Sequence, residues 1–216
     1  MTSKKKLINQ NTGAWFYTNG HFTASYPTES CSHVSDILSA FCDDVGTPKC
    51  LKSDRASELV GRATLFLKLA RKRHINLKYA EPERVNQIHK VDIEMRKLKK
   101  RCRNKMIHKN APKRVWDFAR VHIAKLLQFV PRPTLNNCTG YEEVTGQTPD
   151  ISEFLDFHFW DLVWYWPRKH PGLTADDRWL GHWAGVAHKI GSDMCYWIIP
   201  ESGIPITDNR SAHHAR

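Results

Sequence analysis

The chain has 216 residues, of which 41% are hydrophobic and 25% charged, and its formal net charge is +11. Its 8 Trp, 9 Phe and 6 Tyr supply enough ring surface for a folded core, which argues against a disordered chain. No hydrophobic run reaches the roughly 20 residues that a membrane span needs, and the start of the chain does not have the pattern of a secretory signal.

The charge is unevenly distributed along the chain. Residues 1–140 carry a net charge of +16, and residues 141–216 carry −5. A basic part followed by an acidic part predicts a polyanion-binding domain joined to a different module. The six cysteines include no C-x-x-C pair, so we expect reduced thiols in an intracellular compartment rather than a zinc site or a disulfide framework.

The first pattern along the chain is that of a β-hairpin. The aromatic run 14–18 and the alternating segment 21–26 predict two antiparallel strands. Between them, Asn19-Gly20 predicts a two-residue turn, and Pro27 is expected to end the second strand.

Helices and short strands alternate after this hairpin, which favours a mixed sheet covered by helices. The apolar spacing predicts, in order, a helix capped by Ser30 or Ser32 and ended by Gly46, a strand at 50–53, a helix from Leu65 to His74, a strand at 75–79, a long helix from Ile88 to Met106, and a helix from Pro112 to Leu127.

The hydrophobic pattern of the sequence changes after Phe154. Short apolar runs rich in Trp, Phe and Tyr are separated by Gly, Pro and Asp, which is typical of a small all-β barrel with aromatic residues in its core. We therefore expect a core at 1–130, a linker at 131–155, a barrel at 156–207 and a disordered tail at 208–216.

Three acids are candidates for holding a metal ion. Asp54 follows the strand at 50–53, and strand ends are where α/β folds display metal ligands. Mg²⁺ prefers carboxylate oxygens, and a second carboxylate would come from Asp92 or Glu94 near the start of the long helix. Helix geometry puts these two on opposite flanks of the apolar stripe, so the spacing leaves the choice open. The structural alternative is that Asp54 caps a turn while the other two are solvated.

A long run of positive charge follows these acids. Between Met95 and Trp116 there is no acid, and like charges one turn apart oppose helix formation unless something pairs with them. The DNA backbone is a natural partner, because solvated helix faces normally mix charges of both signs. The expected phosphate contacts are Arg96, Lys97, Lys99, Lys100, Arg101, Arg103, Lys105, Lys109, Lys113 and Arg114.

Four segments, taken in order, resemble the integrase of copia-type retrotransposons. Residues 51–58 resemble the strand that ends in the second catalytic Asp of that family, here Asp54. Residues 83–96 resemble the segment that leads into the catalytic Glu helix. Residues 111–119 resemble its Pro-Lys-x-x-Trp helix, and residues 141–150 its Tyr-Glu-x-x-Thr-Gly-x-x-Pro-Asp signature. The last module is similar to the β region downstream.

The resemblance implies an α/β fold, with a ribonuclease H-like mixed sheet flanked by helices and followed by a small SH3-like barrel. It also implies that two divalent metals, Mg²⁺ or Mn²⁺, are held by Asp, Asp and Glu and join element DNA to target DNA by phosphoryl transfer. In this sequence Asp54 and Asp92 match that pattern as catalytic and metal-binding residues, with Glu94 as the substitute in a shifted helix register.

The sequence departs from the family pattern in two ways. No acid precedes Glu29, so we expect the first strand and its catalytic Asp to be missing. Asp92 is also one methylene shorter than the Glu of the family. We therefore expect an integrase-like DNA-binding protein with impaired catalysis, which resides in the nucleus and forms homo-oligomers. The alternatives are an active integrase with a strand upstream, a non-catalytic nucleic-acid-binding or scaffold remnant, and a reading frame without a selected function.

Overall fold

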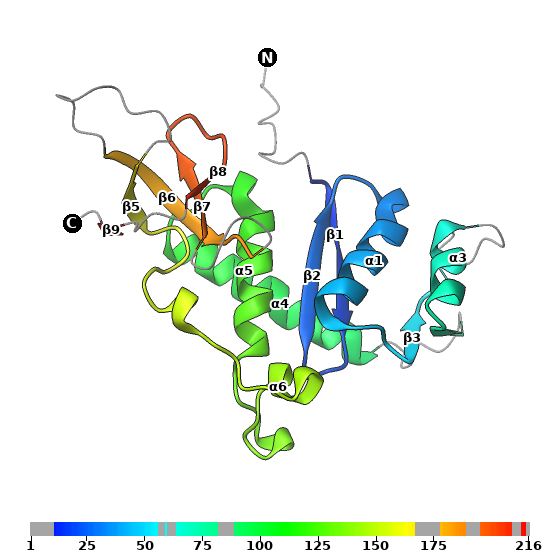
Figure 1. Ribbon diagram of the computed structural model, residues 1–216. Helices are drawn as coiled ribbons and strands as arrows, with labels where there is room; N and C mark the ends of the chain where they lie inside the picture. The colour runs from blue at the N-terminus through cyan, green and yellow to red at the C-terminus, as the bar shows by residue number, and fades with distance from the viewer. Residues whose placement is uncertain are drawn as a thin grey trace. The chain divides into compact units, whose positions relative to one another are not determined.

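The computed structural model describes residues 11–55, 59, 64–81, 89–166, 178–188, 195–208 and 213–214. The chain is a mixed α/β protein that divides into two compact units (Figure 1). The hairpin unit comprises residues 11–99 and 124–149, and the sheet unit comprises residues 100–123 and the chain from 150 onward. This division differs from the consecutive domain limits expected from the sequence, because it assigns residues 100–123 to the same unit as the C-terminal strands.

The hairpin unit begins with antiparallel strands β1 (Gly13–Thr18) and β2 (Thr23–Thr28). The last residue of β1 pairs with the first residue of β2, so the predicted two-residue Asn-Gly turn is wrong and a four-residue loop takes its place. The side chain of Asn19 explains the longer loop. Its Oδ1 accepts hydrogen bonds from the backbone N–H groups of His21 at 2.8 Å and Phe22 at 2.7 Å.

Pro27 lies within β2 instead of ending it. It stands opposite Ala14 of β1, and among the described strands β2 pairs only with β1. Proline has no backbone N–H to donate, but an edge strand needs hydrogen-bond partners on one side only. The strand therefore continues through the proline.

The rest of this unit largely follows the expected order. The 3-10 turn η1 (Cys31–His33) is capped by Ser30 and leads into α1 (Val34–Val45). Strands β3 (Cys50–Ser53) and β4 (Asn76–Tyr79) pair in parallel, and α3 (Leu65–Lys72) lies between them in the chain. Helix α3 ends earlier than predicted, because His74 has a left-handed backbone with φ 54° that interrupts helical geometry.

One hydrophobic core joins the hairpin to α1 and α3. The ring of Tyr17 on β1 stacks on Phe41 of α1, with centroids 4.4 Å apart. Leu38 and Ala70 are fully buried within the same cluster. The two short sheets, β1–β2 and β3–β4, therefore share one apolar core although no described strand connects them.

The Thr-Gly signature near residue 145 forms the short helix α6 (Gly140–Thr145). Thr139 and Glu142 form a capping box, in which each side chain accepts a hydrogen bond from the backbone N–H of the other residue. Gly146 ends the helix with φ 71°, a left-handed conformation that favours glycine. Thr148 then donates a hydrogen bond to Glu142 at 3.1 Å, so the signature residues mainly build this helix and its exit.

The two longest described helices are α4 (His89–His108) and α5 (Trp116–Gln128), separated by the 3-10 turn η3 (Lys113–Val115). Pro112 was expected to open the second helix and instead precedes η3. Both helices contribute residues to each unit, since the unit limits cross α4 after residue 99 and α5 after residue 123.

The sheet unit contains a five-stranded antiparallel sheet of order β8-β7-β6-β5-β9. An all-β module was expected here. The disordered tail expected at 208–216 is wrong in part, because residue 208 ends β8 and two residues pair with β5 as β9. The strands are β5 (Leu162–Tyr165), β6 (Trp179–Val186), β7 (Tyr196–Pro200), β8 (Ile206–Asp208) and β9 (His213–His214).

The core of the sheet unit is aromatic and includes a buried histidine from α5. The ring of His122 stacks on Phe159 at 5.7 Å and meets Trp183 edge-on at 5.2 Å. Burial, with smaller effects from Lys105 and His158, lowers the pKa of His122 to about 4. His122 is therefore a neutral member of this core at physiological pH.

The cysteines whose side chains the structure describes are free thiols, which agrees with the expectation of reduced cysteines. Cys102 of α4 is buried, and its Sγ donates a weak hydrogen bond to the carbonyl of Ala119 at 3.8 Å. Burial raises the pKa of this thiol to about 11, so it packs as a protonated, unreactive group.

A test of the hairpin unit follows from the position of Gly140. A Cβ at this residue would overlap the backbone carbonyl of His21, which cannot move aside like a flexible side chain. We expect Gly140→Ala to lower the free energy of unfolding by about 1–3 kcal/mol, measured by urea denaturation. Gly13→Ala is the matched control, because its Cβ would meet no heavy atom within 4 Å. Equal midpoints for the two variants would contradict the close approach of α6 to the β1–β2 loop.

Candidate nucleic-acid interface

Helix α4 separates buried from charged residues by its own periodicity. Leu98 and Cys102 are buried and lie one turn apart. The exposed side carries four cations at spacings of three, four and seven residues from the first, which places them on one face. We call this set the α4 stripe: Arg96, Lys99, Lys100 and Arg103. The set belongs to one continuous helix, so the helix alone determines its spacing.

Ion pairs among the described residues determine how much of the positive charge of the α4 stripe is compensated. Within the described part of the chain, no acid forms an ion pair with any of its four members. Arg96 contacts an acidic residue only through its backbone: its Nε donates a hydrogen bond to the carbonyl of Asp92 at 3.4 Å, and this carbonyl carries no net charge. The positive charges are exposed to solvent and remain available to a polyanion.

The other six predicted phosphate contacts are not equivalent to the stripe. Lys97 is paired with Glu94 at 2.7 Å, and Lys109 is paired with Asp161 at 2.6 Å. Partial burial and the nearby charge of Lys109 lower the pKa of Lys105. These three are less available to an external anion. The remaining three cations are exposed: Arg101, Lys113 and Arg114.

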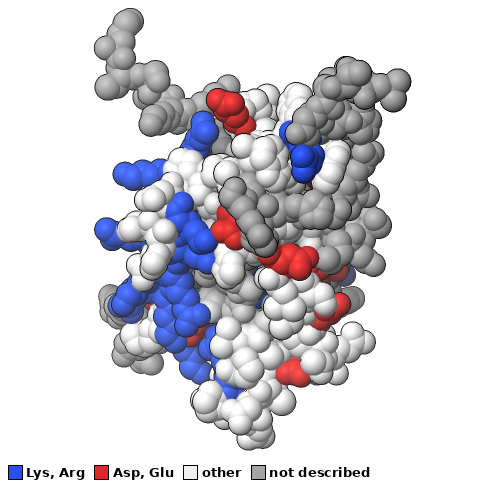
Figure 2. All heavy atoms as spheres, turned by 90° about the vertical axis from the view of Figure 1, so that its left-hand side faces the viewer, with Lys and Arg blue, Asp and Glu red and all other residues white. Residues whose placement is uncertain are grey.

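The surface view agrees with an uneven charge distribution. Figure 2 shows Lys and Arg side chains gathered along one side of the face that it presents. Such clustering raises the local potential and attracts phosphate groups.

The predicted acidic residues lie in the hairpin unit in different settings. Asp54 is exposed directly after β3, where its backbone carbonyl accepts a hydrogen bond from Ser53 Oγ at 3.0 Å. Asp92 is exposed in the first turn of α4. Glu94 is only 7% exposed. The structure therefore distinguishes the two helix carboxylates, whose spacing had left them equivalent.

Glu94 is held by cations inside the hairpin unit. Its Oε1 pairs with Lys97, and its Oε2 lies 3.9 Å from a guanidinium nitrogen of Arg132. Arg132 also donates a hydrogen bond to the carbonyl of Gly20 at 3.0 Å, so it bridges α4 and the β1–β2 loop. Sequence reasoning missed Arg132, because it lies between two prolines and far along the chain from its partners. No local pattern could have identified it.

The described residues do not supply the donor set that a two-metal site needs. Within the described ranges, no three His, Cys, Asp or Glu side chains come together in a group that could hold a metal ion. Two metals require several anionic ligands at one point. The roles predicted for Asp54, Asp92 and Glu94 stay predictions, and the ion pairs of Glu94 give it a structural role in this unit.

Comparison with known proteins gives little to identify the chain. No protein-family model matches it, and no curated protein matches it. Among solved structures, it is similar to a chain of the simian T-cell lymphotropic virus intasome in complex with PP2A regulatory subunit B56 gamma, determined by cryo-EM. The identity is 14% and the TM-score 0.49, over 94% of this chain and 71% of the other. A likeness at this level supports no statement about a site or an activity.

The helices of the described part include none that combines the length and the apolar character of a membrane span.

A stability comparison tests the structural role of Glu94. We expect Glu94→Gln to lower the free energy of unfolding by about 1–3 kcal/mol, because it removes a buried carboxylate from Lys97 and Arg132. Asp92→Asn is the matched control on the same helix, and we expect it to cost less than about 1 kcal/mol, since this carboxylate is exposed. Urea denaturation followed by circular dichroism gives both values. Equal losses would show that the Glu94 ion pairs contribute nothing to stability.

Proposed function

We propose that this protein is an integrase-like protein that binds duplex DNA through phosphate contacts made by the α4 stripe. The observation that carries the proposal is the stripe itself, with four exposed cations on one helix face and no described acid paired with them. The resemblance of four ordered segments to retrotransposon integrases supports the integrase-like part. The finer fold assignments, a ribonuclease H-like core and an SH3-like barrel, belong to the same proposal.

The dimensions of the stripe suit a duplex. At 1.5 Å per residue, the span from Arg96 to Arg103 is about 10 Å along the helix. Duplex DNA carries one negative charge for about every 1.7 Å of its axis, so each cation of the stripe can have a phosphate within reach. Contacts with phosphates carry no sequence information, and we therefore propose binding without strong sequence preference. The DNA partners would be element ends and target duplexes, bound by oligomers of the chain in the nucleus.

The second candidate function is DNA strand transfer. It is favoured by one observation, the exposure of Asp54 at a strand end and of Asp92 at a helix start within the same unit. These two carboxylates would hold Mg²⁺ or Mn²⁺ in a complete form of the site. Among the described residues no group of three possible ligands is found, so DNA binding is the better-supported function.

The DNA-binding proposal predicts the effect of reversing charge on the stripe. We expect Lys99→Glu with Lys100→Glu to weaken duplex binding at least about tenfold at low salt, because each phosphate contact is lost and replaced by repulsion. The slope of log affinity against log salt should fall by about 2, close to one unit for each lost contact. Fluorescence anisotropy with a labelled duplex over a salt series measures both quantities.

The control makes the same change of net charge elsewhere in the hairpin unit. Lys49→Glu with Lys72→Glu alters two exposed lysines, one before β3 and one at the end of α3. We expect this variant to bind duplex DNA nearly as well as the unmodified chain. A similar loss in both variants would mean that only total charge matters, and the assignment to α4 would be wrong.

Substitution of Asp54 separates the two candidate functions. For a DNA-binding protein without catalysis, Asp54→Asn should leave duplex affinity unchanged, and no strand-transfer product should form with Mg²⁺ or Mn²⁺. For a strand-transfer enzyme, the unmodified chain should join a labelled oligonucleotide to a plasmid, and Asp54→Asn should abolish that joining. Gel analysis of the joined product measures the difference.

A further inference from the structure

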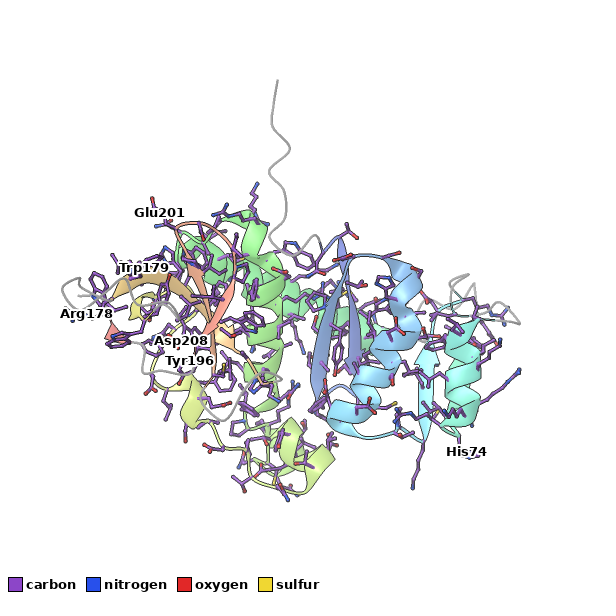
Figure 3. The ribbon with its side chains drawn as sticks, turned by 45° about the horizontal axis from the view of Figure 1, so that its top comes forward. His74, Arg178, Trp179, Tyr196, Glu201 and Asp208 are labelled. Carbon is purple, nitrogen blue, oxygen red and sulfur yellow. The ribbon has the colours of Figure 1, made fainter. Side chains whose placement is uncertain are left out.

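The sheet unit carries an open pocket of about 840 Å³ beside its edge strand β8. Its walls come from β5, β6, β7 and β8 and from the loop after β7. Figure 3 labels Trp179 at the start of β6, Glu201 just beyond the end of β7, and Asp208, which ends β8 opposite Tyr196 at the start of β7. The lining residues on which the argument depends are Tyr165, Trp166, Trp179, Trp197, Glu201 and Asp208.

Two of the rings form a corner. Tyr165 on β5 stands opposite Trp179 on β6, with centroids 6.5 Å apart and planes at 75°. Tyr165 is 2% exposed and fixed in the sheet, while Trp179 leaves 51% of its surface to solvent. Trp197 is anchored edge-on against Phe118 at 5.8 Å. Tyr165 and Trp197 are thus held in place by the unit itself, which reduces the entropy cost of binding a ligand.

The described lining of the pocket carries negative charge, in contrast to the net charge of +11 of the whole chain. Among the residues that the structure describes, the lining includes the carboxylates of Glu201 and Asp208 and no Lys, Arg or His. Asp208 is buried, and its charge adds to burial in raising the pKa of the Tyr165 hydroxyl. These charges would repel phosphates, so the aromatic residues are poorly suited to stacking the bases of a nucleic acid.

Aromatic faces and carboxylates together favour an organic cation. The faces of Trp and Tyr attract a cation within about 6 Å of the ring centroid, and the carboxylates add a charge-to-charge attraction. A methylated ammonium group is the best match, because its methyl groups contact the rings while its charge remains. An unmodified ammonium is more strongly hydrated and therefore loses more hydration free energy on entering such a pocket.

We propose that this pocket binds a methylated lysine side chain in a peptide segment of a partner protein. The volume is much larger than one methylated ammonium, which leaves room for the residues that flank it. Strand β8 is an edge of the described sheet, and three of its residues line the pocket. An extended peptide can pair with such an edge while its modified side chain enters the pocket. The proposal does not depend on DNA binding by the α4 stripe.

The first test compares three peptides of one sequence, built from Ala and Thr with a single central residue. That residue is trimethyllysine, unmodified lysine, or the uncharged carbon analogue of trimethyllysine, in which carbon replaces the nitrogen. Isothermal titration calorimetry with the full chain measures each affinity. We expect the trimethyllysine peptide to bind at least about tenfold more tightly than the other two. Equal binding of the carbon analogue would overturn the role of charge, and equal binding of unmodified lysine would overturn the role of methylation.

The second test uses substitutions inside and outside the pocket. We expect Trp179→Ala to weaken binding of the trimethyllysine peptide at least about tenfold, and Glu201→Gln, on an exposed side chain, about threefold. Trp164→Ala is the matched control, because Trp164 lies on β5 next to Tyr165 but does not line the pocket. Circular dichroism confirms that each variant is folded. An equal loss in the Trp164 and Trp179 variants, or no loss in the Glu201 variant, would overturn the proposal.

A third measurement separates this proposal from DNA binding. The Lys99→Glu, Lys100→Glu variant should bind the trimethyllysine peptide as tightly as the unmodified chain. Single-stranded DNA should not displace the peptide. Displacement by single-stranded DNA would show that the pocket stacks bases instead, and the assignment of a cationic ligand would be wrong.

Discussion

Repulsion among its own cations is the force that helix α4 has to overcome. Lys and Arg side chains one turn apart destabilise an isolated helix, and no acid occurs between Met95 and Trp116 to offset them. The helix is stabilised by its other side, where Glu94 is fixed by Arg132 in the hairpin unit and Cys102 is buried against Ala119 in the sheet unit. The α4 stripe is therefore presented in a regular array because each unit anchors one part of the helix.

The elements of the fold could be predicted where local periodicity decides them. The hairpin strands, the two single strands β3 and β4 and the long basic helix all follow from apolar spacing, whereas the parallel pairing of β3 with β4 was not predicted. The four-residue loop could not be predicted, because Asn-Gly favours a two-residue turn and the side chain of Asn19 stabilises a longer one. The division into units could not be predicted from apolar spacing either, since it depends on contacts between α4, α5 and segments far along the chain. Strand β9 needed a partner, β5, that lies about fifty residues earlier.

The same distinction holds for the candidate site. The basic face of α4 is a local property and was predicted, including the four members of the stripe. Helix geometry could not choose between Asp92 and Glu94, because it describes one helix without its surroundings. In the structure, Arg132 distinguishes these two carboxylates, because it pairs with Glu94 inside the hairpin unit while Asp92 stays exposed. The pair of Lys97 with Glu94 is local in the sequence, whereas the pair of Lys109 with Asp161 joins residues 52 positions apart and had no signal.

The buried histidine of the sheet unit has a consequence for acid stability. His122 has a pKa of about 4 in the folded protein, against an ordinary value of 6.5 in an unfolded chain. Between these two values the unfolded chain binds more protons than the folded one, so the free energy of unfolding falls as the pH is lowered from 6.5 to 4. The loss from this one ring amounts to a few kcal/mol at most, at about 1.4 kcal/mol per pH unit. An acidic compartment would therefore weaken the aromatic core around Trp183, while the same ring costs nothing at neutral pH.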